Sequence, residues 1–114
     1  MKEIEVENPI DAINDNVEMK ISQEGLRVVI NDVIHFIPDE IIPTSKFPYD
    51  KPLIGNYVLY ELNNEAFSGT INLTVKVGIE LSMNVRMGLI KVYYTFNNNE
   101  YKITNFEFQL NYHY

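Results

Sequence analysis

Residues 71 to 87 alternate between apolar and polar side chains without interruption, and this feature constrains the fold most. The apolar side chains occupy every odd position: Ile71, Leu73, Val75, Val77, Ile79, Leu81, Met83, Val85 and Met87. A period of two is typical of a β-strand with one buried face. A straight strand over 70–86 would be about 56 Å long, whereas a compact domain of this size is about 35 Å across. The strand is therefore expected to bend.

The phase of this alternation changes at Gly88, and the change predicts a hairpin. Beyond Gly88 the apolar residues occupy even positions: Ile90, Val92, Tyr94 and Phe96. A two-residue turn at Met87–Gly88 would set Ile90 opposite Val85 and Phe96 opposite Ile79, all on one apolar face. We therefore predict paired strands over 70–86 and 89–96.

A further strand is predicted on each side of this hairpin. Asn98–Asn99 is expected to turn the chain into a strand over 100–113, because Asn tolerates the left-handed backbone that short turns require. One extra residue near Thr104–Asn105, a β-bulge, would set Phe106 opposite Val92. Upstream, residues 57–62 are expected to pair with the first half of the long strand, and its second half then pairs with 89–96.

Gly78 lies at the junction of these two halves. Glycine inside a strand commonly marks a bend, a bulge or a close approach of a neighbouring backbone. On the upstream side of Gly78, the predicted pairing sets Tyr60 opposite Leu73 and Val58 opposite Val75. The sequence therefore predicts a sheet that coils strongly at Gly78.

The N-terminal part of the chain predicts smaller elements. Asn8 and Pro9 suit the start of a helix of one or two turns, after a short strand with its glutamates outward. Residues 17–31 predict a hairpin that turns at Gly25, and 33–37 would extend its second arm. The prolines between residues 38 and 52 predict an extended connection that packs over a sheet edge.

These patterns predict one domain, 1–114, that is all-β or mainly β with one short helix. We expect a strongly coiled antiparallel sheet, as a small β-sandwich or half-barrel, with a long C-terminal meander and an N-terminal hairpin at 17–31. The meander strands are expected near 57–62, 70–86, 89–96 and 100–113. If the N-terminal hairpin is too small to cover the long apolar strip, the remainder is expected to form a subunit interface.

Composition limits the classes of function. The net charge is −7, with the acidic residues spread along the chain, which argues against direct nucleic-acid binding. Such an acidic surface either keeps the protein in solution or meets a basic protein partner. The chain has no cysteine and no long apolar run, so we expect a cytoplasmic protein that does not enter a membrane. Its many Asn and Ile residues suggest an AT-rich bacterial or phage genome.

No pattern in the sequence predicts catalysis. His35 and His113 lie in no metal-ligand spacing, and no serine lies in a nucleophile elbow. His35 is expected to be a half-buried strand residue. Asp11 and Asp15 lack the order of a calcium loop and are expected in a solvated turn. We therefore expect no enzyme, no metal and no cofactor.

The leading hypothesis is a non-enzymatic protein-binding module that self-associates to a homo-oligomer, in one version a phage or mobile-element inhibitor of a host protein. Tyrosine is in excess, and outward tyrosines either stabilise a sheet through cross-strand pairs or contact partners. The candidate partner-binding residues lie in the proline-rich connection or on outward strand positions: Ile41, Ile42, Phe47, Tyr49, Tyr57, Tyr93 and Tyr112.

Two alternatives remain open. A coiled sheet can enclose a small apolar molecule, here lined by Met83, Met87, Phe106 and Phe108. Alternation over two arms is also what a membrane-inserting β-hairpin requires, although no export segment favours that reading.

Overall fold

The computed structural model describes residues 5–43, 50–64, 71–82 and 85–113. Most of these residues lie in strands, and the described part of the chain holds one short helix, which confirms the mainly-β prediction. The elements in chain order are β1 (Glu5–Val6), α1 (Pro9–Asn16), β2 (Glu18–Ile21), β3 (Gly25–Ile30), β4 (Val33–Pro38), β5 (Leu53–Asn64), β6 (Ile71–Ser82), β7 (Val85–Asn97) and β8 (Glu100–His113).

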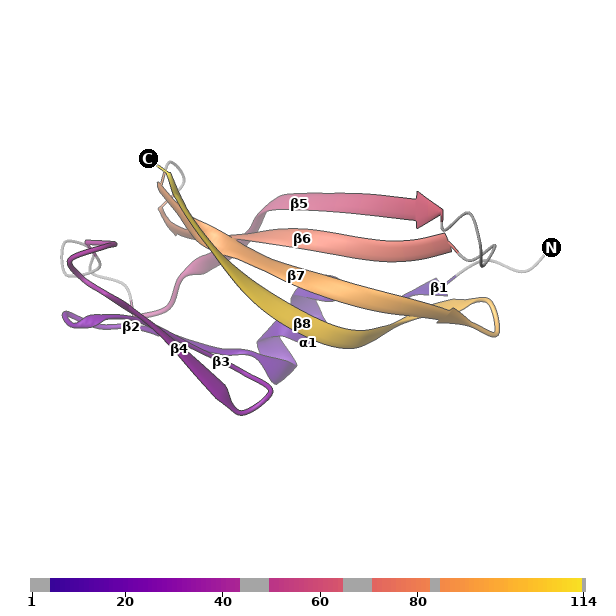
Figure 1. Ribbon diagram of the computed structural model, residues 1–114, viewed down its shortest axis with the longest axis horizontal. Coiled ribbons are helices and arrows are strands. Elements are labelled where there is room, and N and C mark those ends of the chain that lie inside the picture. Colours follow the sequence, from indigo (N-terminus) through magenta and orange to yellow (C-terminus); the bar gives the residue numbers. More distant parts are fainter. Residues whose placement is uncertain (1–4, 44–49, 65–70, 83–84, 114) are drawn as a thin grey trace.

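The strands form two sheets. The larger has the order β1-β8-β7-β6-β5 and curls into a half-barrel, and it is mixed because β1 runs parallel to β8. The smaller is an antiparallel meander in the order β2-β3-β4. Figure 1 shows the smaller sheet across one end of the larger one, with α1 against the hollow face. The molecule is elongated, with extents of 50 × 24 × 24 Å.

The apolar face of β6 is the centre of the core. Leu73, Val75, Val77, Ile79 and Leu81 are all nearly inaccessible to solvent. They share one cluster with Ile13 of α1 and with residues of β2, β3 and β7. Each fully buried aliphatic side chain contributes about 1.5–3 kcal/mol. The described part of the long apolar strip is therefore covered within the chain, and self-association does not need it.

β6 and β7 pair up to Ser82 and Val85, so the prediction of a turn at Met87–Gly88 is wrong. β6 ends at Ser82, which pairs with Val85 at the start of β7. Ile90 accordingly lies opposite Val77 instead of Val85. The predicted strand over 70–86 is thus divided between β6 and β7, and the second arm reaches Asn97.

A bulge explains the change of phase at Gly88. Ile79 pairs with Gly88 and Glu80 pairs with Arg86, which leaves Met87 as an extra residue on β7. One extra residue exchanges the faces to which odd and even positions point, as a two-residue turn also does. Met87, Ile90, Val92 and Tyr94 therefore all reach the core, whereas Phe96 near the end of β7 is exposed.

The prediction that 89–96 pairs with the second half of the long strand is wrong, because residues 89–94 lie opposite residues 73–78. β5 pairs with the first half, as predicted, through residues 58–62 opposite residues 73–77, and it continues past Gly78. Its register is also shifted by two residues, since Tyr60 lies opposite Val75 instead of Leu73. β5 itself begins at Leu53, before the predicted start. A shift of two preserves the face of every side chain, so the apolar pattern does not distinguish the two registers.

The irregularity expected at Gly78 is in the neighbouring strand. The β5–β6 register shifts between Ile54 and Val58, next to Gly78. Figure 1 shows β5 bending along its first half. A Cβ on Gly78 would lie 3.0 Å from the Cβ of Tyr57, so the glycine permits a close approach of the bulged strand.

The prediction for the last two strands is confirmed. Asn98 and Asn99 have φ values of 51° and 64°, as a two-residue hairpin turn requires. Tyr93 pairs with Asn105 and Tyr94 with Ile103, so Thr104 is the predicted bulge residue. Phe106 then lies opposite Val92, as expected.

The N-terminal predictions are confirmed except at β4. The Asn8 side chain accepts hydrogen bonds from the Ile10 and Asp11 N–H groups (2.9 and 3.2 Å) and caps the two-turn helix α1. β2 and β3 form the predicted hairpin. Residues 33–37 do not extend its second arm, because Asn31 and Asp32 both adopt positive φ and reverse the chain into a third strand.

Side-chain and backbone contacts join the remaining parts. The Asn31 side-chain amide donates to Asn105 Oδ1 (2.9 Å), which ties the β3–β4 turn to the β8 bulge. The Ile21 N–H donates to the carbonyl of Asp50 (2.7 Å), so the described end of the proline-rich connection meets the outer edge of β2, as predicted. Within the described residues, no helix combines the length and apolar character that crossing a bilayer requires.

Candidate functional site

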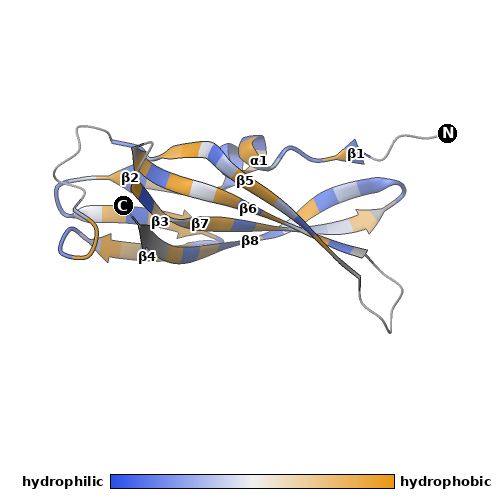
Figure 2. Ribbon diagram, turned by 90° about the horizontal axis from the view of Figure 1, so that it is seen from above, coloured by the Kyte–Doolittle hydropathy of each residue, from blue (hydrophilic) through white to orange (hydrophobic). Residues whose placement is uncertain are grey.

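The outer strand of the smaller sheet carries an exposed apolar surface, which we call the β4 edge and define as Val33, Ile34 and Phe36. These side chains are 55%, 57% and 51% exposed. Ile34 and Phe36 alternate with His35 and Ile37, so they point to the opposite face of the strand. Figure 2 shows β4 as a mostly hydrophobic strand at the margin of the molecule.

The β4 edge lacks the usual protection of an edge strand. Natural edges carry charges, prolines or bulges that prevent pairing with another chain. The strand V-I-H-F-I-P has no Lys, Arg, Asp or Glu, and its proline is the last residue. Its pairing with β3 has no register shift, and no other strand of the described residues pairs with it. Among the described residues, no strand pairs with the outer backbone groups of β4.

The opposite face of β4 belongs to the core. Ile37 is buried in the main cluster. His35 is half-buried, as predicted, and its ring lies 5.6 Å from the ring of Phe108 on β8, centroid to centroid. The inner face thus anchors β4 to the larger sheet at His35 and Ile37, whereas Val33, at the start of the strand, and Ile34 and Phe36 on the outer face remain exposed.

The sequence signal for this surface is a run with apolar residues at both odd and even positions. In residues 33–37, only His35 is polar. A strand of this kind has two apolar faces, whereas β6 has one. Residues 33–37 were predicted to continue the preceding strand, so their two apolar faces were not recognised as a sign of a separate edge strand.

Tyr57 and Tyr93, two predicted contact residues, are half-buried and already have partners. The guanidinium of Arg86 lies over the Tyr57 ring, 4.2 Å from its centroid. The Tyr93 hydroxyl donates to Glu107 Oε2 (3.0 Å) on the neighbouring strand. Burial, this hydrogen bond and the Glu107 charge all raise the pKa of Tyr93. Both rings therefore make cross-strand contacts within the sheet.

Arg86 is nevertheless incompletely paired. Its Nε is buried and has no hydrogen-bond partner among the described residues. The side chain is half-buried beside Gly78 and opposite Glu80 in the register. The stacking on Tyr57 accounts for the position of its guanidinium.

The remaining predicted contact residues differ in their exposure to solvent. Ile41 is 51% exposed and follows the turn at Pro38, whose carbonyl accepts its N–H (2.9 Å). Ile42, the next residue, is fully buried in the core, so it is not available to a partner. Phe47, Tyr49 and the side chain of Tyr112 lie outside the described residues.

The space predicted for an apolar ligand is occupied by the core. Met87 is fully buried, and Phe106 and Phe108 pack against the same cluster. Met83 lies outside the described residues. The half-barrel is instead open between its two edge strands, where a groove of about 540 Å³ is lined by Val6, Glu7, Asn8, Pro9, Ile10, Val58 and Tyr60.

Tyr94 lies next to Glu7, one of the residues that line this groove. It is nearly inaccessible to solvent, and its hydroxyl donates to the Glu7 carbonyl (2.7 Å). Burial raises the pKa of Tyr94 far above its ordinary value, and Tyr60 and Glu7 raise it further. The Glu7 carboxylate accepts the Ile103 N–H (2.8 Å), which leaves less of its charge for a ligand in the groove.

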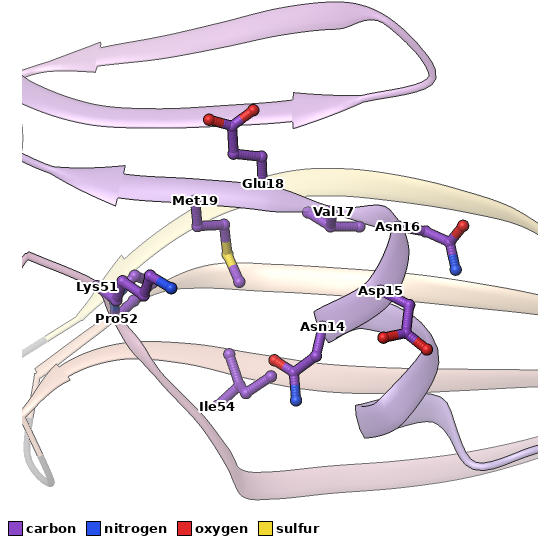
Figure 3. A pocket seen from close by; sticks show the side chains of 9 residues that line it. All are labelled: Asn14, Asp15, Asn16, Val17, Glu18, Met19, Lys51, Pro52 and Ile54. Carbon is purple, nitrogen blue, oxygen red and sulfur yellow. The ribbon is translucent and has the colours of Figure 1, made fainter.

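A second hollow of about 330 Å³ lies between α1, β2 and the start of β5 (Figure 3). Asn14, Met19 and Ile54 point into it, whereas Glu18 and Asn16 point away. Asn16 donates to the Ala12 carbonyl (2.9 Å), and Glu18 lies 3.9 Å from Arg27. Asp15 and Lys51 are the charged groups that remain at the rim, and the arrangement resembles no catalytic pair.

The described residues contain no group of three or more His, Asp or Glu side chains that could hold a metal ion. No protein-family model, no curated protein and no solved structure matches this chain. Function must therefore be inferred from the surfaces of the molecule.

Proposed function

We propose that this protein is a non-enzymatic protein-binding module that self-associates through the β4 edge. One observation supports the proposal above all others: an unprotected edge strand with three large apolar side chains, each more than half exposed. Such strands are templates for pairing with another chain.

The energetics of the β4 edge favour a partner. Full burial of a large aliphatic or aromatic side chain contributes about 1.5–3 kcal/mol, so completing the burial of Ile34 and Phe36 contributes roughly half of that each. Each backbone hydrogen bond adds about 0.5–1.5 kcal/mol. Because the chain carries a net charge of −7, two copies repel one another unless they meet through uncharged residues, and β4 is such a segment.

The test is the mass of the protein in solution as a function of concentration, measured by sedimentation equilibrium. We expect a concentration-dependent dimer for the natural sequence and a monomer for Ile34→Lys combined with Phe36→Lys. Leu62→Lys is the matched control, because Leu62 is 66% exposed on β5 of the other sheet. A monomeric natural protein at every concentration contradicts self-association, and loss of the dimer in Leu62→Lys moves the interface to β5.

A basic protein partner, suggested by the acidic composition, stays a prediction. Capture of a partner from a bacterial lysate by the natural protein and not by Ile34→Lys would support binding through the same edge. Equal capture by both variants would place the partner elsewhere on the protein.

The groove between β1 and β5 favours a second candidate function, the binding of a small apolar molecule. Val6, Ile10, Val58 and Tyr60 supply its apolar walls. Native mass spectrometry of the freshly purified protein tests this function. A bound small molecule that is lost in Val58→Trp would support it, and an unliganded mass with no uptake of an added fatty acid would contradict it.

A further inference from the structure

We infer that two copies of this chain join by antiparallel β4–β4 pairing, with Ile34 opposite Phe36 of the second copy and a two-fold axis at His35. The inference rests on the proposed self-association and adds its register. It follows from three properties of β4: the direction of its backbone groups, its neighbouring residues and its charge.

The tight turn at Asn31–Asp32 sets the direction of the backbone groups. In a two-residue hairpin the residues that flank the turn, here Ile30 and Val33, form a hydrogen-bonded pair. Hydrogen-bonded and non-hydrogen-bonded pairs then alternate along the ladder. His35 and Ile37 therefore bond to β3, and the N–H and C=O groups of Ile34 and Phe36 point outward.

Only one symmetric register uses both outward residues. An axis at Ile34 would set Phe36 opposite Asp32, which belongs to the turn. An axis at Phe36 would set Ile34 opposite Pro38, which has no N–H and whose carbonyl already accepts from Ile41 and Ile42. An axis at His35 sets Ile34 against Phe36 twice and forms four backbone hydrogen bonds.

The occupant that we propose is a second copy, because β4 is self-complementary in this register. The same strand supplies both halves of the contact, so the interface is isologous and closes at two chains. The two small sheets then form one continuous six-stranded sheet. On its outer face the Ile34 and Phe36 side chains of the two copies lie directly opposite each other, at the Cβ separation of about 4.5–5.5 Å typical of cross-strand pairs.

The charge of the two copies gives the dimer a distinctive salt dependence. Each copy carries a net charge of −7, whereas the paired β4 strands contain no Lys, Arg, Asp or Glu. The two copies therefore repel one another across an uncharged contact. Screening of this repulsion strengthens the dimer as salt increases, whereas a complex with a basic partner weakens.

Single cysteines test the register, because the natural chain contains none. In this register residues 35 of the two copies form a non-hydrogen-bonded pair with a Cα separation of about 4.5 Å, which a disulfide spans. Residues 34 of the two copies are diagonal neighbours, about 7–8 Å apart. Under mild oxidation we expect His35→Cys to form a disulfide-linked dimer at least tenfold faster than Ile34→Cys, and Ile34→Cys combined with Phe36→Cys to link efficiently.

The outcomes separate the register from the proposed function. A dimeric natural protein in which Ile34→Cys links faster than His35→Cys overturns the register and leaves self-association intact. A monomeric natural protein overturns both. A dimer that weakens between 50 and 500 mM salt also overturns the inference, because it requires opposite charges at the contact. Circular dichroism of each variant establishes that the cysteine has not unfolded the chain.

Discussion

β6 and β4 are both rich in apolar residues, yet one lies at the centre of the protein and the other at its margin. β6 alternates strictly, so one face is apolar, and α1 and the smaller sheet contribute to the core that covers it. β4 has apolar residues at odd and even positions, and the core covers only its inner face. An apolar strand therefore indicates a partner only where a second apolar face remains after the core is complete.

The largest expected effect comes from substitutions that contrast these two strands. Ile79→Ala on β6 removes a fully buried side chain and should lower the free energy of unfolding by about 2–5 kcal/mol. Ile34→Ala on β4 should cost less than about 1 kcal/mol in dilute protein, because its side chain is already 57% exposed. Urea denaturation measures both values, and similar losses would remove the distinction between the strands.

Gly78 tests how tightly the covered sheet is packed. Gly78→Ala places a methyl group 3.0 Å from the Tyr57 Cβ and should cost about 1–3 kcal/mol of stability. Because the nearest contact is the Tyr57 Cβ itself, truncation to alanine does not relieve it, whereas Tyr57→Gly combined with Gly78→Ala should recover part of the loss. If Gly78→Ala left the free energy of unfolding unchanged, β5 would have to move away from the added methyl group easily at its bulge.

Tyr94 is expected to make the stability of the protein depend on pH in the alkaline range. Its folded-state pKa lies above the ordinary value of about 10. The neutral phenol therefore stabilises the folded state below pH 10, and this contribution is lost as the pH rises from 10 toward the folded-state pKa. Tyr94→Phe should lose about 0.5–1.5 kcal/mol at neutral pH with the hydrogen bond to Glu7.

Above pH 10 the stability of Tyr94→Phe should fall less steeply than that of the natural protein. Thermal unfolding at a series of pH values measures the difference. Parallel curves for the two proteins would show that the Tyr94 phenol does not control the alkaline transition.

The smallest effect is expected at the exposed hydrogen bond of Tyr93. Tyr93→Phe removes the contact with Glu107 on the solvent side of the sheet and should change stability by less than about 0.5 kcal/mol. It should also leave the dimer intact, since the ring makes a cross-strand contact. Loss of the dimer in Tyr93→Phe, seen by sedimentation, would return Tyr93 to the partner-binding surface.

Short-range features were predictable because neighbouring residues determine them. The Asn8 cap, the Asn98–Asn99 turn and the Thr104 bulge each depend on a few residues with distinctive backbone preferences. The end of β6 at Ser82 and the start of β7 at Val85 were missed because a bulge at Met87 changes the phase of alternation just as a turn does.

The candidate surface was predictable only in part. Of the predicted contact residues, Ile41 is exposed and Ile42 is buried, although they are adjacent in the chain. The register of β5 was likewise open, because a shift of two residues leaves the same side chains on the same face. Neither the different burial of these two isoleucines nor the register of β5 is determined by local backbone preferences.

The amino-acid order by itself determined which faces of the strands are apolar and that the chain turns at Gly25 and at Asn98–Asn99, because strand periodicity and turn conformation are local properties. The tertiary structure decided which apolar face is covered, since that depends on how many elements pack against it. β6 receives α1 and a second sheet, whereas the outer side of β4 receives nothing from the described part of the chain.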